Sequence, residues 1–378
     1  MRTIGIIGGG PGGLTLAQVL ATHGIATTVF ERDEHPLARP QGGSLDLHAE
    51  SGQRALREAG LEAEFTALAR YEDQGGAVYD HHGTLRAREP EDGGGDRPEI
   101  DRTQLRALLL ESLSPEAVRW GSRVSGVEPL ADGRWRVMGG TGALGAFDLV
   151  VGADGAWSRV RPWVSAETPA YTGVVAVELM IDEVDAKHPA LAALLPYGKL
   201  MAVDGARGLI AQRSSAGHVR VYIMLRVPEE RLREGIVDAS PPGRARAQLR
   251  ALLPGWAPSL LGFIDACEET ITPRPIVALP VEHRWSHRPG VTLLGDAAHV
   301  MTPFSGEGVN MAMLDALELA HALAGSDDWS AAVKGYEACM FERAAEAAAG
   351  AMDGLNGFVS EDALSHLVEH FEGMKSPA

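Results

Sequence analysis

Short apolar runs and helical patterns alternate at the start of the chain. The run Ile4–Ile7 has the length and composition of a strand that is covered on both faces. Residues 12–23 then carry apolar side chains at helical spacing, and Gly24 follows as a typical helix end. A second apolar run, residues 26–30, ends at Glu31. The pattern predicts a strand, a glycine-rich turn, a helix and a second strand, which is the repeating unit of a parallel sheet.

The same patterns return further along the chain. Apolar runs typical of buried strands occupy residues 149–151 and 291–294, and a glycine follows each of them closely. Amphipathic helices are predicted over residues 49–59 and 102–113. Residues 326–378 are predicted to form C-terminal helices, because their pattern is helical and rich in alanine.

Residues 165–285 lack this rhythm. Successive strands joined by polar turns are predicted at residues 173–181, 200–203, 208–213 and 218–227. Strands that follow one another without helices between them favour an antiparallel sheet. Residues 71–97 show a similar pattern and are expected to join that sheet. We therefore predict an α/β protein in which a Rossmann-like domain contains an inserted, mainly antiparallel β-sheet domain and is followed by C-terminal helices.

The first glycine-rich turn carries the G-x-G-x-x-G spacing at Gly8, Gly10 and Gly13. The first glycine permits the tight turn, the second lets the backbone approach a pyrophosphate, and the third permits close packing of the helix. The N-terminus of that helix presents free N–H groups to phosphate. Glu31 is placed to accept hydrogen bonds from a ribose. These features predict a dinucleotide without a 2′-phosphate, and they leave both NAD and FAD open.

Composition narrows the classes of partner. The chain has 378 residues and 45% hydrophobic content, enough for two or three cores. Its net charge of −17 argues against nucleic acid and anionic membranes as partners, and no apolar run approaches the roughly 18 residues that span a bilayer. Cys267 and Cys339 form neither a disulfide framework nor a metal site, and no signal-peptide pattern opens the chain. We expect a cytoplasmic, metal-free protein, monomeric or homodimeric, that binds neither nucleic acid nor a membrane.

Three predicted strands end in glycine-containing turns, and ligands bind beyond the carboxyl ends of such strands. The later turns are Asp154-Gly155 and the segment 295–310, which reads GDAAHVMTPFSGEGVN. Together the turns resemble those of the FAD-dependent aromatic hydroxylases of the p-hydroxybenzoate hydroxylase type. In that family a glycine fingerprint, a D-G motif and a G-D-A-A-H-x-x-x-P-x-x-G-x-G-x-N motif occur in this order. The resemblance covers essentially the whole chain and selects FAD over NAD.

Within that family the chain is most similar to the tetracycline-inactivating flavin monooxygenases. The similarity is carried by VFERD, GGSLDLH, PEIDRTQLR, GDAAHVMTPFSGEGVN and YEACMF. It implies that Glu31 holds the adenosine ribose, that Arg32 lies near the adenine and that Asp46 lies near the isoalloxazine. The residues implied to bind FAD are Gly8, Gly10, Gly13, Glu31, Arg32, Asp46, Arg102, Arg106, Asp154, Asp296, Pro303, Gly306, Gly308, Val309 and Asn310.

The resemblance also implies a mechanism. NADPH or NADH binds transiently and reduces FAD, O2 forms a flavin C4a-hydroperoxide, and one oxygen atom passes to an electron-rich ring or enolate. Because the cofactor carries this chemistry, no catalytic side chain is assigned. His299 is given no catalytic role, since the sequence shows no carboxylate partner for it. The groups expected nearest the flavin are Asp46, Pro303, Gly306, Glu307 and Gly308.

The implied substrate is a polycyclic phenolic or enolic compound, with the tetracycline antibiotics as the named candidate. Glu178, Lys199 and Arg220 are expected in its pocket, where they would replace a glutamine, an arginine and a histidine of the tetracycline-inactivating enzymes. Glu307 replaces the glutamine of the usual G-Q-G. The alternatives are a hydroxylase of another aromatic or polyketide metabolite, a non-hydroxylating FAD enzyme of the same fold, and a dinucleotide-binding sensor.

Overall fold

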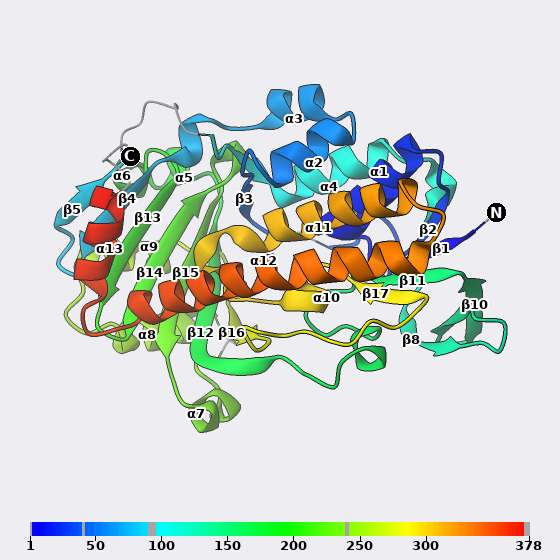
Figure 1. Ribbon diagram of the computed structural model, residues 1–378. Helices are drawn as coiled ribbons and strands as arrows, with labels where there is room; N and C mark the ends of the chain where they lie inside the picture. Colours follow the sequence, from blue (N-terminus) through cyan, green and yellow to red (C-terminus); the bar gives the residue numbers. More distant parts are fainter. Residues whose placement is uncertain (1, 40–41, 90–95, 239–241, 374–378) are drawn as a thin grey trace. The chain divides into compact units, whose positions relative to one another are not determined.

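The computed structural model describes residues 2–39, 42–89, 96–238 and 242–373 (Figure 1). The chain forms two compact units, each made of three chain segments. Unit 1 comprises Met1–Ala69, Arg102–Ala170 and Val277–Met352. Unit 2 comprises Arg70–Asp101, Tyr171–Ile276 and Asp353–Ala378. The division assigns no ligand to either unit, so the domains expected from the sequence stay predictions. They are an FAD-binding domain at 1–70, 98–164 and 286–325, a substrate domain at 71–97 and 165–285, and a separate C-terminal segment at 326–378.

Unit 1 is built on a five-stranded parallel sheet with the order β17-β11-β1-β2-β7. Its strands are β1 (Ile4–Ile7), β2 (Thr27–Phe30), β7 (Val118–Arg119), β11 (Leu149–Gly152) and β17 (Val291–Leu293). Every residue of β1, β11 and β17 is buried, which explains why these strands are continuous apolar runs in the sequence. β1 lies at the centre of the sheet, where Ile4 pairs with Leu149 on one side and with Thr27 on the other.

Helices of unit 1 pack around this sheet. They are α1 (Pro11–Thr22), α2 (Gly52–Glu58), α3 (Glu62–Leu68), α4 (Arg102–Glu111), α10 (Asp296–His299), α11 (Glu307–Ala324) and the greater part of α12 (Trp329–Phe358). In Figure 1, α1 lies beside α11. The approach is close, because a Cβ on Gly12 would be only 3.0 Å from the Ala312 carbonyl oxygen. Single-turn helices occur at η2 (Pro115–Ala117), η3 (Arg161–Trp163) and η5 (Pro303–Ser305).

Unit 1 also contains a small antiparallel sheet, β10-β9-β8. Its strands are β8 (Val124–Pro129), β9 (Trp135–Gly139) and β10 (Gly142–Phe147). No strand was predicted from the sequence at β10. In the structure Gly142 takes a φ of +129° at the hairpin and lets the chain return along β9. The short strand β3 (Ser44–Asp46) completes the unit.

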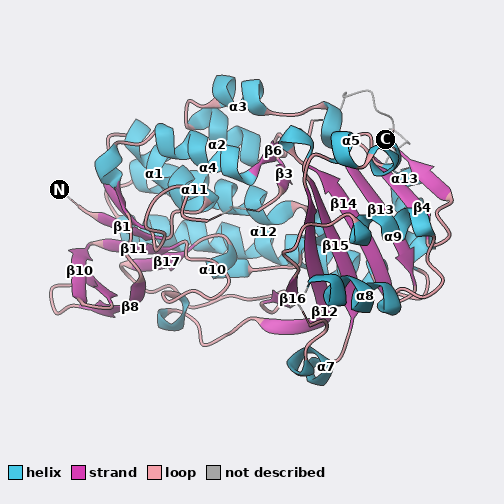
Figure 2. Ribbon diagram, turned by 180° about the vertical axis from the view of Figure 1, so that it is seen from behind, coloured by secondary structure: helices cyan, strands magenta, loops and turns pink. Residues whose placement is uncertain are grey.

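Unit 2 is built on a seven-stranded sheet with the order β16-β12-β15-β14-β13-β4-β5 (Figure 2). The pairings from β12 through β13 and between β4 and β5 are antiparallel, and β13 pairs with β4 in parallel. The strands are β4 (Gly76–Asp80), β5 (Leu85–Arg88), β12 (Ala170–Ile181), β13 (Lys199–Asp204), β14 (Arg207–Arg213), β15 (Val219–Arg226) and β16 (Thr272–Ala278), and a short strand, β6 (Glu99–Asp101), lies outside this sheet. The predicted mainly antiparallel sheet is confirmed.

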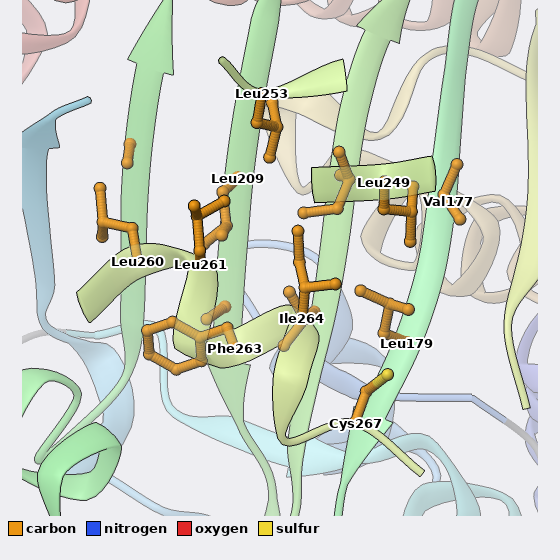
Figure 3. Packing of buried hydrophobic residues seen from close by; sticks show 14 of the residues in the cluster. Val177, Leu179, Leu209, Leu249, Leu253, Leu260, Leu261, Phe263, Ile264 and Cys267 are labelled. Atoms are coloured by element: carbon orange, nitrogen blue, oxygen red, sulfur yellow. The ribbon is translucent and has the colours of Figure 1, made fainter. Parts of the chain in front are cut away.

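The two faces of this sheet differ. One face packs against α8 (Pro242–Leu252) and α9 (Pro258–Asp265), and Figure 3 shows the side chains of these helices meeting those of the strands. On the other face, α13 (Ala363–Gly373) covers β4 and β5 through Phe371. The unit also contains α5 (Val184–Lys187), α6 (Pro189–Leu194), α7 (Glu229–Glu234), η1 (Glu72–Gln74) and η4 (Ser215–Gly217).

The predicted C-terminal helices are confirmed as α12 and α13. Over the described residues, no helix combines the length and apolar character that crossing a membrane requires.

Candidate functional site

Three turns meet at the carboxyl ends of the neighbouring strands β1, β11 and β17. Gly8 follows β1 with a φ of +112°. A Cβ on Gly8 would be 2.2 Å from the carbonyl oxygen of Ala153, so only glycine fits where the first turn contacts the second. Gly295, after β17, also needs a positive φ, of +58°. The sheet therefore brings together the three motifs that lie far apart in the sequence.

Two glycines of the fingerprint differ in their surroundings. A Cβ on Gly13 would be 2.1 Å from the carbonyl oxygen of Gly8, so this glycine permits α1 to pack onto the turn. At Gly10, a Cβ would meet no atom within 4 Å. The space beside Gly10 is thus open for a ligand to approach the backbone, at the N-terminus of α1, as a pyrophosphate would.

The carboxylate of Glu31 is buried beside the first turn. Its Oε2 accepts a hydrogen bond from the Gly9 N–H and its Oε1 accepts one from the Asp33 N–H, each at 2.9 Å. Each carboxylate oxygen can accept a further bond, so a ribose hydroxyl could be held as well. Arg32, next in the chain, is exposed.

Arg106 on α4 contacts the first glycine turn. Its Nε donates to the Gly9 carbonyl oxygen at 3.2 Å, and one of its terminal nitrogens lies 3.6 Å from Glu31 Oε2. Burial lowers the pKa of Arg106, which the carboxylates of Glu31 and Asp33 partly offset. Arg106 therefore lies at the Glu31 end of the site.

Asn310 joins the loop before α11 to the segment after β3. Its side-chain oxygen accepts the His48 N–H at 2.9 Å, and its side-chain nitrogen donates to the carbonyl oxygens of Asp46 and Gly306 at 2.9 and 3.1 Å. Gly306 has a φ of +69°, and a Cβ there would be 2.9 Å from an oxygen of Asp46. Asp46 and Gly306, which are predicted to lie nearest the flavin, and Asn310, which is predicted to bind FAD, therefore lie together.

The other residues of the loop 303–310 that were predicted to bind FAD are close to Gly306 in the chain. Pro303 begins η5, which leads directly into Gly306. A Cβ on Gly308 would meet no atom within 4 Å, as at Gly10. Gly308 and Val309 lie in the first turn of α11, where backbone N–H groups are free of helical partners. Such a turn can hold a partly negative ring edge.

Asp154 presents an orphaned polar atom. Its Oδ2 accepts the Arg159 N–H at 2.6 Å, whereas its Oδ1 is buried without a hydrogen-bond partner in the described structure. Desolvation raises the pKa of this carboxyl group. An unsatisfied buried carboxylate oxygen is costly, and a ligand hydroxyl would satisfy it. The neighbouring Arg161 is not available to a phosphate, because its guanidinium donates to the carbonyl oxygens of Ala156, Glu167 and Ala297.

Asp296 begins α10 and is accessible to solvent. The surrounding protein nevertheless desolvates its carboxyl group and raises the pKa, while the positive charges of His299 and Arg102 act in the opposite direction. A group that is accessible yet desolvated is typical of the lining of a ligand site. Arg102, at the start of α4, is exposed, and its side chain passes alongside Gly42.

The structure corrects one interpretation of the sequence. His299 does have a carboxylate partner, since its Nε2 lies 2.6 Å from Asp315 Oδ2 on α11. Asp315 is fully buried, and it also accepts the Gly295 N–H and a bond from Arg343. Burial acts to lower the pKa of His299, but the carboxylates of Asp315 and Asp296 act to raise it, and the net shift is upward. A signal was present, because Asp315 interrupts the apolar face of α11.

The three residues predicted to contact substrate share one face of the unit 2 sheet. Glu178 on β12 pairs with Tyr222, and Lys199 on β13 lines up through Gln212 with Arg220 on β15. Glu178 is buried and accepts hydrogen bonds from Arg220 and from Arg274, a partner that no sequence motif indicated. Lys199 lies apart, with β14 and β15 between its strand and β12. Their contact with substrate stays a prediction.

Comparison with known proteins agrees with this geometry. The model of the family described as FAD binding domain matches residues 1–236 and 271–349. The chain is 31% identical to the monooxygenase asqM of Emericella nidulans, over 85% of this chain and 83% of that protein. It is also 31% identical to an FAD-dependent urate hydroxylase of Mycolicibacterium vanbaalenii, over 90% of this chain and 85% of the hydroxylase.

Solved structures share the fold. Klebsiella pneumoniae HpxO, complexed with FAD and uric acid, superimposes with a TM-score of 0.82 at 24% identity, covering 98% of this chain and 93% of HpxO. The tetracycline destructase Tet(51) superimposes with a TM-score of 0.71 at 17% identity, covering 99% and 96%. The likeness to tetracycline-inactivating enzymes is thus one of fold. The extent of the family match and the relatives in sequence lead to a single conclusion: the chain belongs to the FAD-dependent monooxygenases of the p-hydroxybenzoate hydroxylase type.

Proposed function

We propose that this FAD-dependent monooxygenase uses NADH or NADPH and O2 to hydroxylate an electron-rich polycyclic phenolic or enolic compound, with the tetracyclines as the named candidate. When bound, FAD supplies the electron transfer and the activation of oxygen. The chain's own residues hold the cofactor, orient the substrate and exclude water.

We assign the cofactor's two ends to the two ends of the site. The first glycine turn, Glu31 and Arg106 hold the adenosine and pyrophosphate. Asp154 and Asp296 accept hydrogen bonds from hydroxyl groups of the part of FAD that connects the adenosine to the flavin ring. The loop 303–310, with Asp46, holds the flavin ring. This assignment is supported by the open positions at Gly10 and Gly308 and by the unpartnered Oδ1 of Asp154.

The polar face of the unit 2 sheet is the observation that carries the substrate class. Because side chains alternate along a strand, Glu178, Arg220, Tyr222 and Gln212 all lie on the face opposite α8 and α9. Arginine is suited to an enolate or phenolate oxygen, and a carboxylate accepts bonds from hydroxyl or amide groups. A ring system that carries several hydroxyl or enol groups would match such a set.

The relatives support the same chemistry. One is named a urate hydroxylase and another a 6-hydroxynicotinate 3-monooxygenase, while a structure of similar fold is a 2,6-dihydroxypyridine-3-hydroxylase. Each of these names describes an oxygen-substituted, electron-rich ring. We infer that this chain takes a substrate of the same electronic character.

A substrate panel tests the proposal. Purified protein reconstituted with FAD is given NADH or NADPH together with tetracycline, a phenolic polyketide or urate, and oxidation of the nicotinamide and the mass of the product are measured. The expected result is faster oxidation with one substrate class and a product heavier by one oxygen atom. Oxidation that yields hydrogen peroxide and no oxygenated product across a broad panel would support a non-hydroxylating FAD enzyme instead.

The sheet face is tested by a pair of variants. Replacement of Arg220, which is largely buried, by glutamine should raise the KM for substrate about tenfold or more, since a charged hydrogen bond is lost. Arg274→Gln is the matched control, because this second partner of Glu178 is mostly exposed, and its effect should be smaller. Equal KM values in the wild type and Arg220→Gln would separate this face from substrate binding.

A further inference from the structure

His48 lies between two carboxylates at the end of the site that holds Gly306. Its side chain is fully buried, with a relative exposure of 0%. The ring Nε2 is 3.4 Å from Asp46 Oδ2, and the ring Nδ1 is 3.4 Å from Glu307 Oε1. The imidazole thus has a carboxylate opposite each of its nitrogens.

Backbone contacts fix this arrangement. The Asn310 side chain accepts a hydrogen bond from the His48 N–H and donates to the carbonyl oxygens of Asp46 and Gly306. These bonds fix the spacing between β3 and the first turn of α11. Gly306 turns with a positive φ close to the Asp46 carboxylate, where a larger residue would clash. These contacts hold the backbone of Asp46, His48 and Gly306 in place, and both carboxylates lie beside the ring.

The charges of the three groups decide the protonation of the ring. A neutral imidazole can donate from one nitrogen only, whereas an imidazolium donates from both. Opposite charges within a few ångströms favour the charged form of a histidine. Asp46 and Glu307 keep 26% and 28% of their side chains exposed to solvent, whereas the ring between them is fully buried. The imidazolium is the form that satisfies both neighbours.

We propose that His48 is held as an imidazolium between Asp46 and Glu307, and that this cluster sets the charge beside the flavin ring at −1. With glutamine at position 307 the same cluster would be neutral. Compared with glutamine, the negative charge of Glu307 disfavours the reduced, anionic flavin, so Glu307 lowers the midpoint potential of bound FAD. The positive charge of His48 has the opposite effect and raises it. The effect on potential rests on the placement of the flavin at the Gly306 loop, whereas the protonation of His48 does not.

The first test uses the FAD-free protein. Histidine ring nitrogens are labelled with ¹⁵N and followed by NMR from pH 5 to pH 9. His48 should show two protonated nitrogens at pH 7, and Glu307→Gln should move its titration midpoint down by about one unit or more. Glu58→Gln is the control, because Glu58 on α2 forms another carboxylate–histidine pair with His321 on α11, at 3.1 Å and on the surface. A neutral His48 at pH 7, or a midpoint unmoved by Glu307→Gln, overturns the proposal.

The second test measures the midpoint potential of bound FAD by dye equilibration. Glu307→Gln should make it more positive and His48→Gln more negative, while Glu58→Gln should leave it unchanged. A merely structural role would not shift the two variants in opposite directions. Shifts of the same sign, or none in Glu307→Gln, contradict the effect on the flavin even where the NMR result holds.

Discussion

At the scale of single residues, Glu31 connects the first turn with the end of β2. Its two oxygens accept hydrogen bonds from the backbone N–H groups of Gly9, after β1, and Asp33, after β2. Arg106 faces the same carboxylate and also holds the turn through the Gly9 carbonyl oxygen. The residue thus shapes the turn in addition to offering acceptors to a ribose.

Glu31→Gln tests this role. The amide keeps one acceptor and replaces the other with a donor that faces an N–H group, so charged hydrogen bonds worth about 1.5–3 kcal/mol each are lost. The Kd for FAD should rise about tenfold or more, as measured by quenching of flavin fluorescence. Glu34→Gln, at an exposed position nearby, should leave the Kd unchanged. An equal Kd for Glu31→Gln and wild type would place the ribose elsewhere.

Asp315 is predicted to be important for stability, and in a pH-dependent way. Asp315→Asn leaves His299 and Arg343 without their buried counter-charge, a change that costs about 3–5 kcal/mol. The pKa of Asp315 is lowered, by His299 and Arg343 against the effect of burial, so its contribution is present above about pH 3.9 and fades as pH falls through the folded value. The pKa of His299 is raised, so its contribution is full below about pH 6.5 and fades as pH rises through the folded value.

Urea unfolding at pH 6 and at pH 9 measures this effect. The stability difference between wild type and Asp315→Asn should be about 3 kcal/mol or more at pH 6 and smaller at pH 9. Asp327→Asn, an exposed acid beyond the same helix, serves as the control and should match wild type at both values. A difference that is the same at pH 6 and pH 9 would show that His299 is neutral in the folded protein.

At the scale of elements, two glycines of the turn between β1 and α1 are predicted to have different roles, one in packing and one in ligand binding. Gly13→Ala would bring a Cβ to 2.1 Å from the Gly8 carbonyl oxygen and should destabilise the protein by about 1–3 kcal/mol through overpacking.

Gly10→Ala meets open space and should change stability by less than about 1 kcal/mol. Its methyl group would instead fill the place of the pyrophosphate, so FAD affinity should fall. Calorimetric titration and urea unfolding distinguish the two, and a fully retained affinity in Gly10→Ala would exclude the pyrophosphate from this turn.

Many elements could be predicted because their signals are local. The buried strands, the glycine turns and the long C-terminal helices follow from runs of a few residues. The strand β10 was missed, because glycine and alanine carry no strand pattern and its pairing with β9 decides the structure. The carboxylate partner of His299 was missed for a related reason, since Asp315 lies on a different element and the sequence does not show which helix faces which.

At the scale of the whole molecule, each unit has its own core. Phe371 on α13 is buried against Val78 and Ala87 in unit 2, whereas the glycine turns belong to unit 1. Phe371→Ala should therefore lower the free energy of unfolding by about 3–5 kcal/mol while the Kd for FAD of the folded protein stays within about twofold. Urea unfolding and fluorescence titration of the same variant check both parts. A large loss of FAD affinity would show that the two cores are coupled.

The candidate site was predictable where a motif names its residues and unpredictable where distant residues meet. Glu31, Asp154 and the 303–310 loop stand in motifs, so their positions could be expected. The contact of His48 with Glu307 and the binding of Arg274 to Glu178 join positions that the sequence separates widely. Such pairs depend on sheet order and helix packing, which one sequence does not display.

The central place of β1 has a consequence for synthesis of the protein. β1 is made first, yet it pairs with β11, and Thr3 hydrogen-bonds to a residue 145 positions later. β17 and α11 follow only after residue 290. The nascent chain therefore exposes apolar strands for most of its translation, during which slow, non-local pairing favours chaperone binding or aggregation. The three turns that follow β1, β11 and β17 can therefore meet only after the segment beyond residue 295 has left the ribosome.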